Sequence, residues 1–182
     1  MTDPTTKPNR KTKITLIVFF SILCLSCKNE AVYNQYHKID RFMWEKNKEY
    51  SFTFHIDDAA ALYDITLEVR NNSFYPYQNL WIFYTERPPA GALRRDTIEC
   101  ILADDFGRWY GKGISLFQSG FPLRTRYQFP LEGKYTFTFR QGMRHDTLSG
   151  IQNIGLRVEQ SAKLPGPRPQ TSPSAKHRAG EK

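Results

Sequence analysis

The sequence predicts an all-β protein, built as an antiparallel β-sandwich of the jelly-roll or Ig-like kind. Apolar and polar residues alternate with a period of two through most of the middle of the chain, which is the pattern of strands with one buried and one solvated face. Short runs of Gly, Pro, Asn and Asp separate these segments, and several short strands punctuated in this way are typical of sandwiches. Residues 59–62 are the best helical candidate and could form one turn at most.

The predicted strands are spread along the whole middle of the chain. Clear alternation predicts strands at residues 50–56, 63–70, 134–140 and 154–159. Residues 79–84 are apolar on both faces, which indicates a central strand or one beneath a second layer. Weaker patterns predict a strand at 98–102 and a short one at 127–129. Turns are expected between them at residues 57–58, 71–73, 87–91, 119–120 and 132–133.

The first 27 residues have the order of a signal peptide. Basic residues end at Lys13, and an apolar run follows that is shorter than the roughly 20 residues of a membrane-spanning helix. The stretch Leu25-Ser26-Cys27 resembles a lipobox, in which a cysteine after a small residue is lipidated and becomes the new amino terminus. We therefore expect lipidation at Cys27, with an uncleaved membrane anchor as the alternative. Either interpretation places residues 28–182 outside the cytoplasm.

The distribution of charge supports a division into three parts. Of the net charge of +8, residues 1–27 carry +3 and residues 161–182 carry +4, which leaves +1 for residues 28–160. We expect residues 28–160 to form the β-sandwich and residues 161–182 to be a disordered basic tail rich in Pro. A nucleic-acid-binding domain usually carries its basic residues on the folded surface, so no nucleic-acid partner is expected.

The densest polar and aromatic segment covers residues 104–113. Two adjacent aspartates would point to opposite faces of a strand, which is poor geometry for an acid–base pair, and one such pair supplies too few ligands for calcium. A tight turn that uses Asp and Gly for their backbone tolerance is one interpretation. The other is an interaction loop, whose candidate residues are Asp104, Asp105, Arg108, Trp109 and Lys112.

The remaining reactive residue types do not form a catalytic pattern. The four histidines lack the spacing of a metal-binding pair, and His55 falls on the polar side of its strand. Cys100 is expected to be a small buried hydrophobic residue. The sequence contains neither G-x-S-x-G nor a P-loop. We therefore expect no metal, no cofactor and no enzymatic activity; a hydrolase with dispersed carboxylates stays open as a minor alternative.

The aromatic residues offer a second functional hypothesis. Trp44, Trp81 and Trp109, with Tyr75 and Tyr77, could form a platform on which sugar rings stack. Packing in the core and at sheet edges is the competing explanation, because aromatic side chains mostly serve burial.

Several short stretches along the chain together carry a family resemblance. They include LAD, GRW and GKG at residues 102–104, 107–109 and 111–113, QGMR at 141–144 and LSGI at 148–151, with further matches at residues 32–37, 63–65, 69–71, 75–80, 96–99 and 155–159. In this order they resemble the gliding-motility lipoproteins of the GldH type, found in Bacteroidota. The resemblance runs from about Cys27 to Glu159.

The resemblance implies a small lipidated protein needed for gliding, which in that phylum is tied to type IX secretion and to other Gld lipoproteins. It carries over no catalytic residue, and it implies an anchored interaction domain that supports envelope machinery, with the membrane and other gliding or secretion proteins as partners. Lys28 follows Cys27, and Glu30 is the only acidic residue near it, so we expect the periplasmic face of the outer membrane. A glycan-binding sandwich on a lipid anchor is the alternative function.

Overall fold

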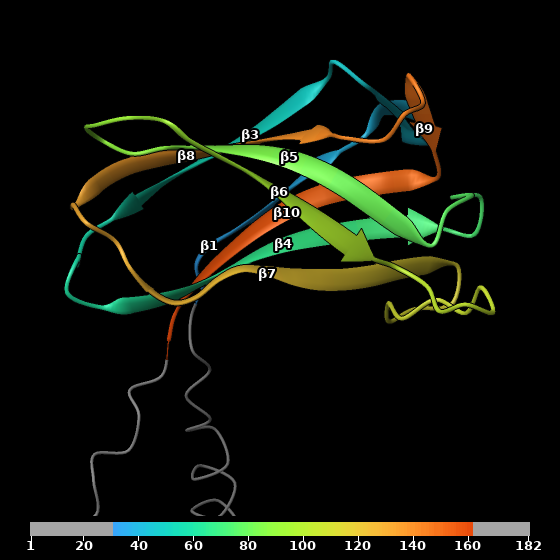
Figure 1. The fold of residues 1–182 in the computed structure, drawn as a ribbon. Helices are drawn as coiled ribbons and strands as arrows, with labels where there is room; N and C mark the ends of the chain where they lie inside the picture. Colours follow the sequence, from blue (N-terminus) through green and yellow to red (C-terminus); the bar gives the residue numbers. More distant parts are fainter. Residues whose placement is uncertain (1–30, 162–182) are drawn as a thin grey trace, which may run out of the picture. The chain divides into compact units, whose positions relative to one another are not determined.

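Ten strands supply nearly all the regular structure in the computed structural model, which describes residues 31–161 (Figure 1). In chain order they are β1 (Ala31–Lys38), β2 (Met43–Glu45), β3 (Glu49–Ile56), β4 (Leu62–Asn72), β5 (Asn79–Arg87), β6 (Arg94–Ile101), β7 (Leu116–Gln128), β8 (Gly133–Gln141), β9 (Thr147–Ser149) and β10 (Ile151–Gln160). The single turn of 3-10 helix, η1 (Asp40–Phe42), precedes β2. None of the helical structure within residues 31–161 is long and apolar enough to cross a membrane. The predicted all-β class is confirmed, whereas Cys27 and the tail beyond residue 161 lie outside the described residues.

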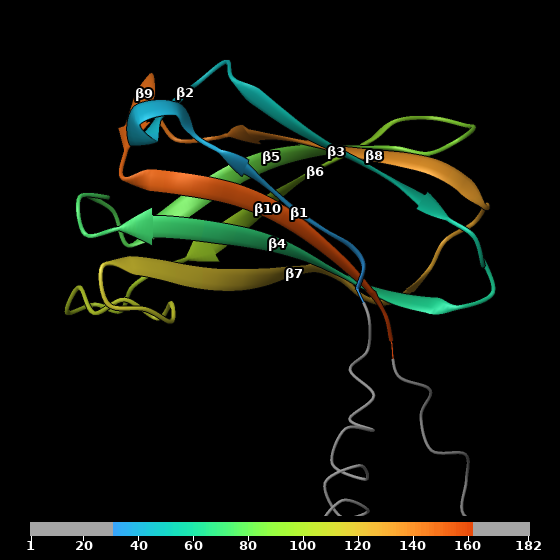
Figure 2. The same cartoon turned by 180° about the vertical axis from the view of Figure 1, so that it is seen from behind.

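The strands form two four-stranded sheets and one small ribbon, and every pairing is antiparallel. Sheet I has the order β1-β10-β4-β7, sheet II the order β3-β8-β5-β6, and β2 pairs with β9. The two large sheets lie face to face (Figures 1 and 2). Ile65 and Leu67 of sheet I and Phe137 and Phe139 of sheet II are among the buried residues between them. The inward positions alternate with polar ones most clearly along β3, β5 and β8, as in a sandwich.

Most strands lie where alternation predicted them. β3, β4, β8 and β10 cover the four segments of clear alternation, and β6 covers most of the weaker one. The doubly apolar segment 79–84 lies in β5, which pairs with both β6 and β8 and is therefore central in sheet II. Trp81 and Phe83 point from β5 to the outer face, where they are 39% and 43% exposed. This strand is central in its sheet but is not covered by a second layer on its outer face.

The longest strand, β7, corrects two predictions. Ser119 and Gly120 lie inside it and form no turn, and Tyr127 lies near the end of this same strand and does not belong to a separate short one. Gly120 and Pro122 ordinarily weaken a strand, but β7 is an edge strand of sheet I, where Pro is tolerated because one row of backbone groups needs no partner. β1, the other edge of sheet I, also went unpredicted because its burial alternates weakly.

One end of the sandwich gathers the β2–β9 ribbon and the loops at residues 73–78 and 102–115 (Figures 1 and 2). β1 begins and β10 ends at the opposite end, since Ala31 pairs with Glu159. Trp44 of β2 is fully buried and donates its Nε1 hydrogen bond to the carbonyl of Lys48 at 2.9 Å. Gly150 (φ +86°) joins β9 to β10 beneath the 73–78 loop, and a Cβ there would collide with the backbone of Tyr75. We call the end with these loops the distal end.

Candidate functional site

The loop at residues 102–115 is folded around the carboxylate of Asp104. Its Oδ1 accepts hydrogen bonds from the backbone N–H groups of Phe106 at 3.0 Å and Arg108 at 2.8 Å, and its Oδ2 accepts one from Arg108 Nε at 2.7 Å. The pKa of Asp104 is lowered, chiefly by the hydrogen bond from the backbone N–H of Arg108. Desolvation opposes this shift in part, and the Arg108 guanidinium adds to it. The backbone N–H of Gly107 also donates to the Asp104 carbonyl at 2.9 Å. Asp104 therefore organises the loop from within.

Trp109 and Lys112 attach the loop to the sandwich. Trp109 forms an isolated bridge with Ala103 and stacks on Phe117 of β7, with ring centroids 5.6 Å apart. Lys112 and Gln118 exchange two backbone hydrogen bonds of 3.0 Å. The structure thus brings the predicted loop residues together, but Asp104, Trp109 and the backbone of Lys112 support the loop, while Asp105 and the Arg108 side chain are exposed.

The same loop exposes apolar side chains that sequence reasoning missed. Phe106, Tyr110 and Ile114 are 86%, 65% and 97% exposed, and Phe74 in the neighbouring loop is 79% exposed. Gln78 links the two loops, because its Nε2 donates to the Asp104 carbonyl at 2.9 Å and its own carbonyl accepts from the backbone of Leu102. We call Phe74, Phe106, Tyr110 and Ile114 the distal apolar surface. The spacing of Phe106, Tyr110 and Ile114, at every fourth position of a Gly-rich polar segment, could have indicated this surface from the sequence.

The aromatic platform proposed from the sequence does not exist in that form. Trp44 and Tyr75 are buried in the core, and Trp109 is half-buried against β7. Only Trp81 and the half-buried Tyr77 remain near a surface, where they line a hollow of about 310 Å³ with Met143 and His145. The other three rings pack against the sandwich because this removes a large apolar area of each ring from water.

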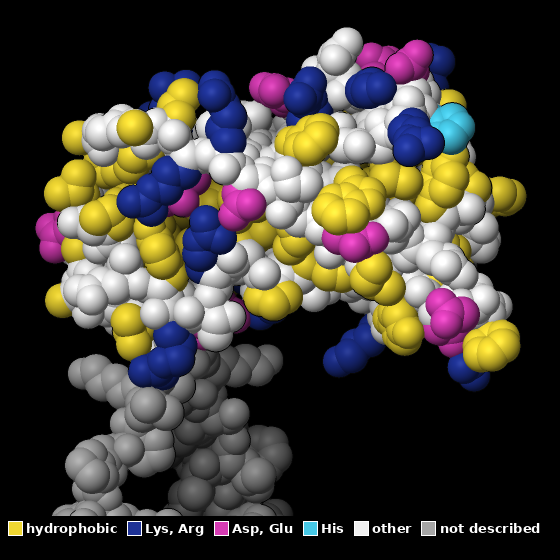
Figure 3. Space-filling model, viewed as in Figure 1, with side chains coloured by type: hydrophobic (Ala, Val, Ile, Leu, Met, Phe, Trp, Pro, Cys, Tyr) yellow, Lys and Arg dark blue, Asp and Glu magenta, His cyan; other side chains and the backbone are white. Residues whose placement is uncertain are grey.

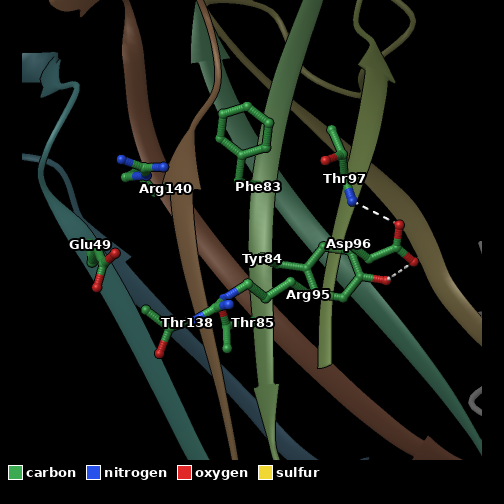
Figure 4. Close-up of a pocket in the computed structure, with 9 residues that line it drawn as sticks. All are labelled: Glu49, Phe83, Tyr84, Thr85, Arg95, Asp96, Thr97, Thr138 and Arg140. Carbon is green, nitrogen blue, oxygen red and sulfur yellow. Dashed lines mark hydrogen bonds between the residues drawn. The ribbon is translucent and has the colours of Figure 1, made fainter. Parts of the chain in front are cut away.

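The outer face of sheet II carries a second hollow, of about 440 Å³ (Figure 4). Two neighbouring rows of the sheet supply most of its lining. One row holds Glu49, Arg140, Phe83 and Thr97, and the other holds Ser51, Thr138, Thr85 and Arg95. Figure 4 shows the Arg95 side chain reaching from β6 across β5 toward Thr85 and Thr138. The arrangement combines the rings of Phe83 and Tyr84, two guanidinium groups, two carboxylates and several hydroxyls.

A polar network covers the outer face of sheet I. The carboxylate of Glu68, buried on this face, accepts hydrogen bonds from Arg157 Nε at 3.1 Å and from Gln118 Nε2 at 3.3 Å. Gln118 also binds Arg70 Nε, and the Arg70 guanidinium lies over the Tyr36 ring at 3.9 Å. These contacts join all four strands of the sheet, so the network is a structural element.

Cys100 and His55 lie where the sequence predicted them. Cys100 is fully buried, as expected, and burial raises the pKa of its thiol to about 12. His55 is exposed on the polar side of β3, also as expected, with Nε2 at 3.6 Å from Asp57. Within residues 31–161, no three His, Cys, Asp or Glu side chains are placed to hold a metal ion.

Comparisons with known protein sequences relate this chain to one family. The sequence model of the family described as GldH lipoprotein matches residues 31–158. The chain is 30% identical over 156 residues to the Gliding motility lipoprotein GldH homolog of Christiangramia forsetii, a match that covers 81% of this chain and 95% of the relative. It is 26% identical over 152 residues to the Gliding motility lipoprotein GldH of Flavobacterium johnsoniae, covering 80% and 94%.

Proposed function

This chain belongs to the GldH lipoprotein family, and from that premise we propose that it is a non-catalytic interaction module of the gliding and type IX secretion machinery, held at a membrane of the cell envelope. The names of the relatives as gliding motility lipoproteins support a role in gliding and a lipid-anchored location. The distal apolar surface is the observation that carries the docking role.

Lipidation of Cys27 would tether the module to a membrane at the end where β1 begins. Three residues separate Cys27 from Ala31, so the intervening chain reaches about 15 Å at most. The end of the sandwich where β1 begins would therefore lie close to the lipid surface. A strand as long as β10 measures about 33 Å, which sets the distal loops well away from the anchoring membrane, on the side where a partner protein can approach.

The chemistry of the distal apolar surface favours a protein partner. Large apolar side chains are seldom left this exposed in groups unless another molecule covers them. Two of the four are Phe and one is Tyr, which are enriched at the centres of protein interfaces, and Asp105 and Arg108 supply a charged rim. The hydrogen bonds of Asp104 and Gln78 hold the loops in place before binding, which lowers the entropy lost on docking.

Two carboxylates that serve as acceptors within the fold support a non-catalytic role. Asp104 is engaged by Arg108, and Glu68 by Arg157 and Gln118. A general acid or base needs a carboxylate free to exchange a proton with substrate, whereas these carboxylates serve as acceptors within the fold. Cys100, the thiol among the described residues, is inaccessible as a nucleophile.

A cross-linked pull-down from the native envelope tests the docking role. The full chain and the double variant Phe106→Ser/Ile114→Ser are each recovered after mild cross-linking, and their partners are identified by mass spectrometry. We expect other gliding or secretion proteins with the native chain and a strong loss of them with the variant. The matched control is Val32→Ser/Leu131→Ser, which removes two exposed apolar side chains away from the distal end. Equal recovery by all three proteins would overturn the proposal.

We further propose the periplasmic face of the outer membrane as the anchoring side. Lys28 beside Cys27, with Glu30 as the one nearby acidic residue, supports this. Protease added to intact cells is expected to leave the protein whole, and to degrade it once the outer membrane is permeabilised. Rapid loss from intact cells would contradict this location.

A further inference from the structure

The outer face of sheet II has the composition of a site for an acidic sugar polymer. Its hollow is lined by the exposed Phe83 ring, by two arginines, by a row of hydroxyls and by the carboxylates of Glu49 and Asp96, and it lies away from the distal apolar surface that serves the proposed docking role. We propose that this face binds a glycan whose sugars carry carboxylates. The proposal does not depend on the docking role, because it involves other residues and another kind of ligand.

The charges on the outer face of sheet II favour an anionic ligand. Among the described residues, neither Arg95 nor Arg140 forms an ion pair or donates a side-chain hydrogen bond, although both line the hollow. Outward-facing cations on this sheet outnumber carboxylates, with Arg87, Lys134, Arg95 and Arg140 against Glu49 and Glu99. A guanidinium matches a carboxylate with two parallel hydrogen bonds. Asp96, which also lines the hollow, is already engaged by Arg124 and the Tyr84 hydroxyl. The two unpaired guanidiniums therefore favour a ligand with repeated carboxylates.

Phe83 supplies a surface on which a sugar ring can stack. Its ring packs on Gly142, where a Cβ would lie 3.0 Å from the ring and force it away from the sheet. Figure 4 looks onto the outer face and shows the Phe83 ring broadside, between Arg140 and Thr97. The Arg140 guanidinium lies 5.5 Å from the ring centroid. Trp81 follows two positions away on the same face, so a second ring continues the platform along β5, where Figure 3 shows hydrophobic side chains gathered at the surface.

The hydroxyl groups of the face complement sugar hydroxyls. Thr85 and Thr97 line the hollow together with Thr138, whose Oγ1 is 2.8 Å from Ser51 Oγ. A hydroxyl both donates and accepts, and Glu49 at the rim of the hollow accepts hydrogen bonds from ligand hydroxyls. An extended peptide would instead pair with the free backbone of an edge strand such as β6. The broad face of hydroxyls and flat rings favours the glycan.

Titration of the full chain in detergent micelles with short uronate oligosaccharides tests the proposal. A hyaluronan hexasaccharide and a galacturonate hexamer serve as acidic probes, an uncharged galactan of matched length as the neutral probe, and a glutamate hexapeptide as the acidic peptide probe. We expect at least one uronate probe to bind, more weakly at high salt, and about tenfold more tightly than the neutral or peptide probe.

Variants locate the binding on this face. Phe83→Ala and Arg95→Gln/Arg140→Gln are each expected to weaken uronate binding about tenfold or more. Leu131→Ala and Lys38→Gln, an exposed apolar residue outside the hollow and an exposed cation of sheet I, are the matched controls and should change uronate binding less than about threefold. Phe106→Ser/Ile114→Ser should leave it unchanged, which separates this site from the docking role. Absence of uronate binding, equal binding of the neutral or peptide probe, or equal loss in the controls would each overturn the proposal.

Discussion

The Asp104 carboxylate accepts a hydrogen bond from Arg108 Nε at 2.7 Å and closes the loop that follows β6. The same carboxylate binds two backbone N–H groups within the loop. A segment with three glycines among residues 107–113 loses much conformational entropy on ordering, and these hydrogen bonds offset part of that loss. The pair therefore explains how Phe106 and Tyr110 can be held exposed in one arrangement.

Asp104→Ala is expected to loosen this loop without unfolding the sandwich. The loss of three acceptor contacts should speed amide hydrogen exchange at residues 104–112, while the Tm stays within about 2 °C of the native value because the loop adds little to the core. Hydrogen exchange followed by mass spectrometry compares the loop with the strands of the sandwich. Asp105→Ala, an adjacent exposed carboxylate, is the control and should leave exchange unchanged. Equal exchange in the two variants would contradict this role for Asp104.

The Glu68–Arg157 pair is expected to stabilise sheet I measurably. Its 3.1 Å contact lies on a largely buried carboxylate that joins β4 to β10. A double-mutant cycle with Glu68→Gln and Arg157→Gln, read from denaturant unfolding, should give a coupling free energy of about 1–2 kcal/mol. The exposed Lys46–Asp146 pair, at 3.8 Å, is the comparison and should give about 0.5 kcal/mol or less. Similar values for both pairs would show that burial does not strengthen the first.

Glu86 is expected to destabilise the fold at neutral pH. It faces the core with 1% exposure, and among the described residues neither carboxylate oxygen has a hydrogen-bond partner, although Arg94 Nη1 lies 3.8 Å away. Burial, opposed in part by Arg94 and Arg124, raises the pKa of Glu86. The folded state then holds a proton that the unfolded chain releases, so stability falls as the pH rises through the unfolded and then the folded pKa.

Glu86→Gln should therefore raise the free energy of unfolding at pH 7 by about 1–3 kcal/mol, since it removes an unsatisfied buried charge. The gain should shrink as the pH is lowered through and below the ordinary glutamate pKa of about 4, because Glu86 then becomes protonated in the unfolded as well as the folded state. Urea unfolding across this pH range measures the difference in free energy of unfolding, and Glu99→Gln on the exposed face is the control. A gain that is absent, or that does not vary with pH, would contradict this account of Glu86.

Cys27→Ser is expected to abolish the lipid anchor. The variant should incorporate no labelled fatty acid and should be processed more slowly, and any processed protein should leave the membrane fraction, because each buried methylene of an acyl chain contributes about 0.8 kcal/mol to anchoring. Metabolic labelling and membrane fractionation measure these changes. Cys24→Ser is the matched control and should be acylated normally; undiminished labelling of Cys27→Ser would show that another residue carries the lipid.

Alternation of residue types was enough to predict the strands whose two faces differ. Phe137 and Phe139 face the core while Thr136 and Thr138 face solvent, so β8 could be predicted from its period of two. The edge strand β7 could not, because Gly120 and Pro122 interrupt the pattern for reasons that depend on its place in the sheet. Strand order depends on contacts between distant residues, which no local pattern contains.

The candidate sites were only partly predictable for a related reason. The loop at 102–115 was identified by its charged and aromatic residues, but whether Trp109 is buried against Phe117 or free depends on the position of β7. Phe83 was expected only as part of a buried strand, whereas it lies between Arg140 and Thr97 on an open face. These neighbours come from three different strands, so their meeting follows from sheet order rather than from spacing along the chain.

Site-specific photo-cross-linking in living cells tests the central claim most directly. A photoreactive residue is placed at Ile114 of the distal apolar surface and, in a second protein, at Lys134 on the outer face of sheet II. The account predicts that position 114 cross-links to another component of the gliding or type IX secretion machinery, and that position 134 does not give this adduct. Absence of any such component at position 114, or the same adduct from position 134, would contradict docking through the distal end.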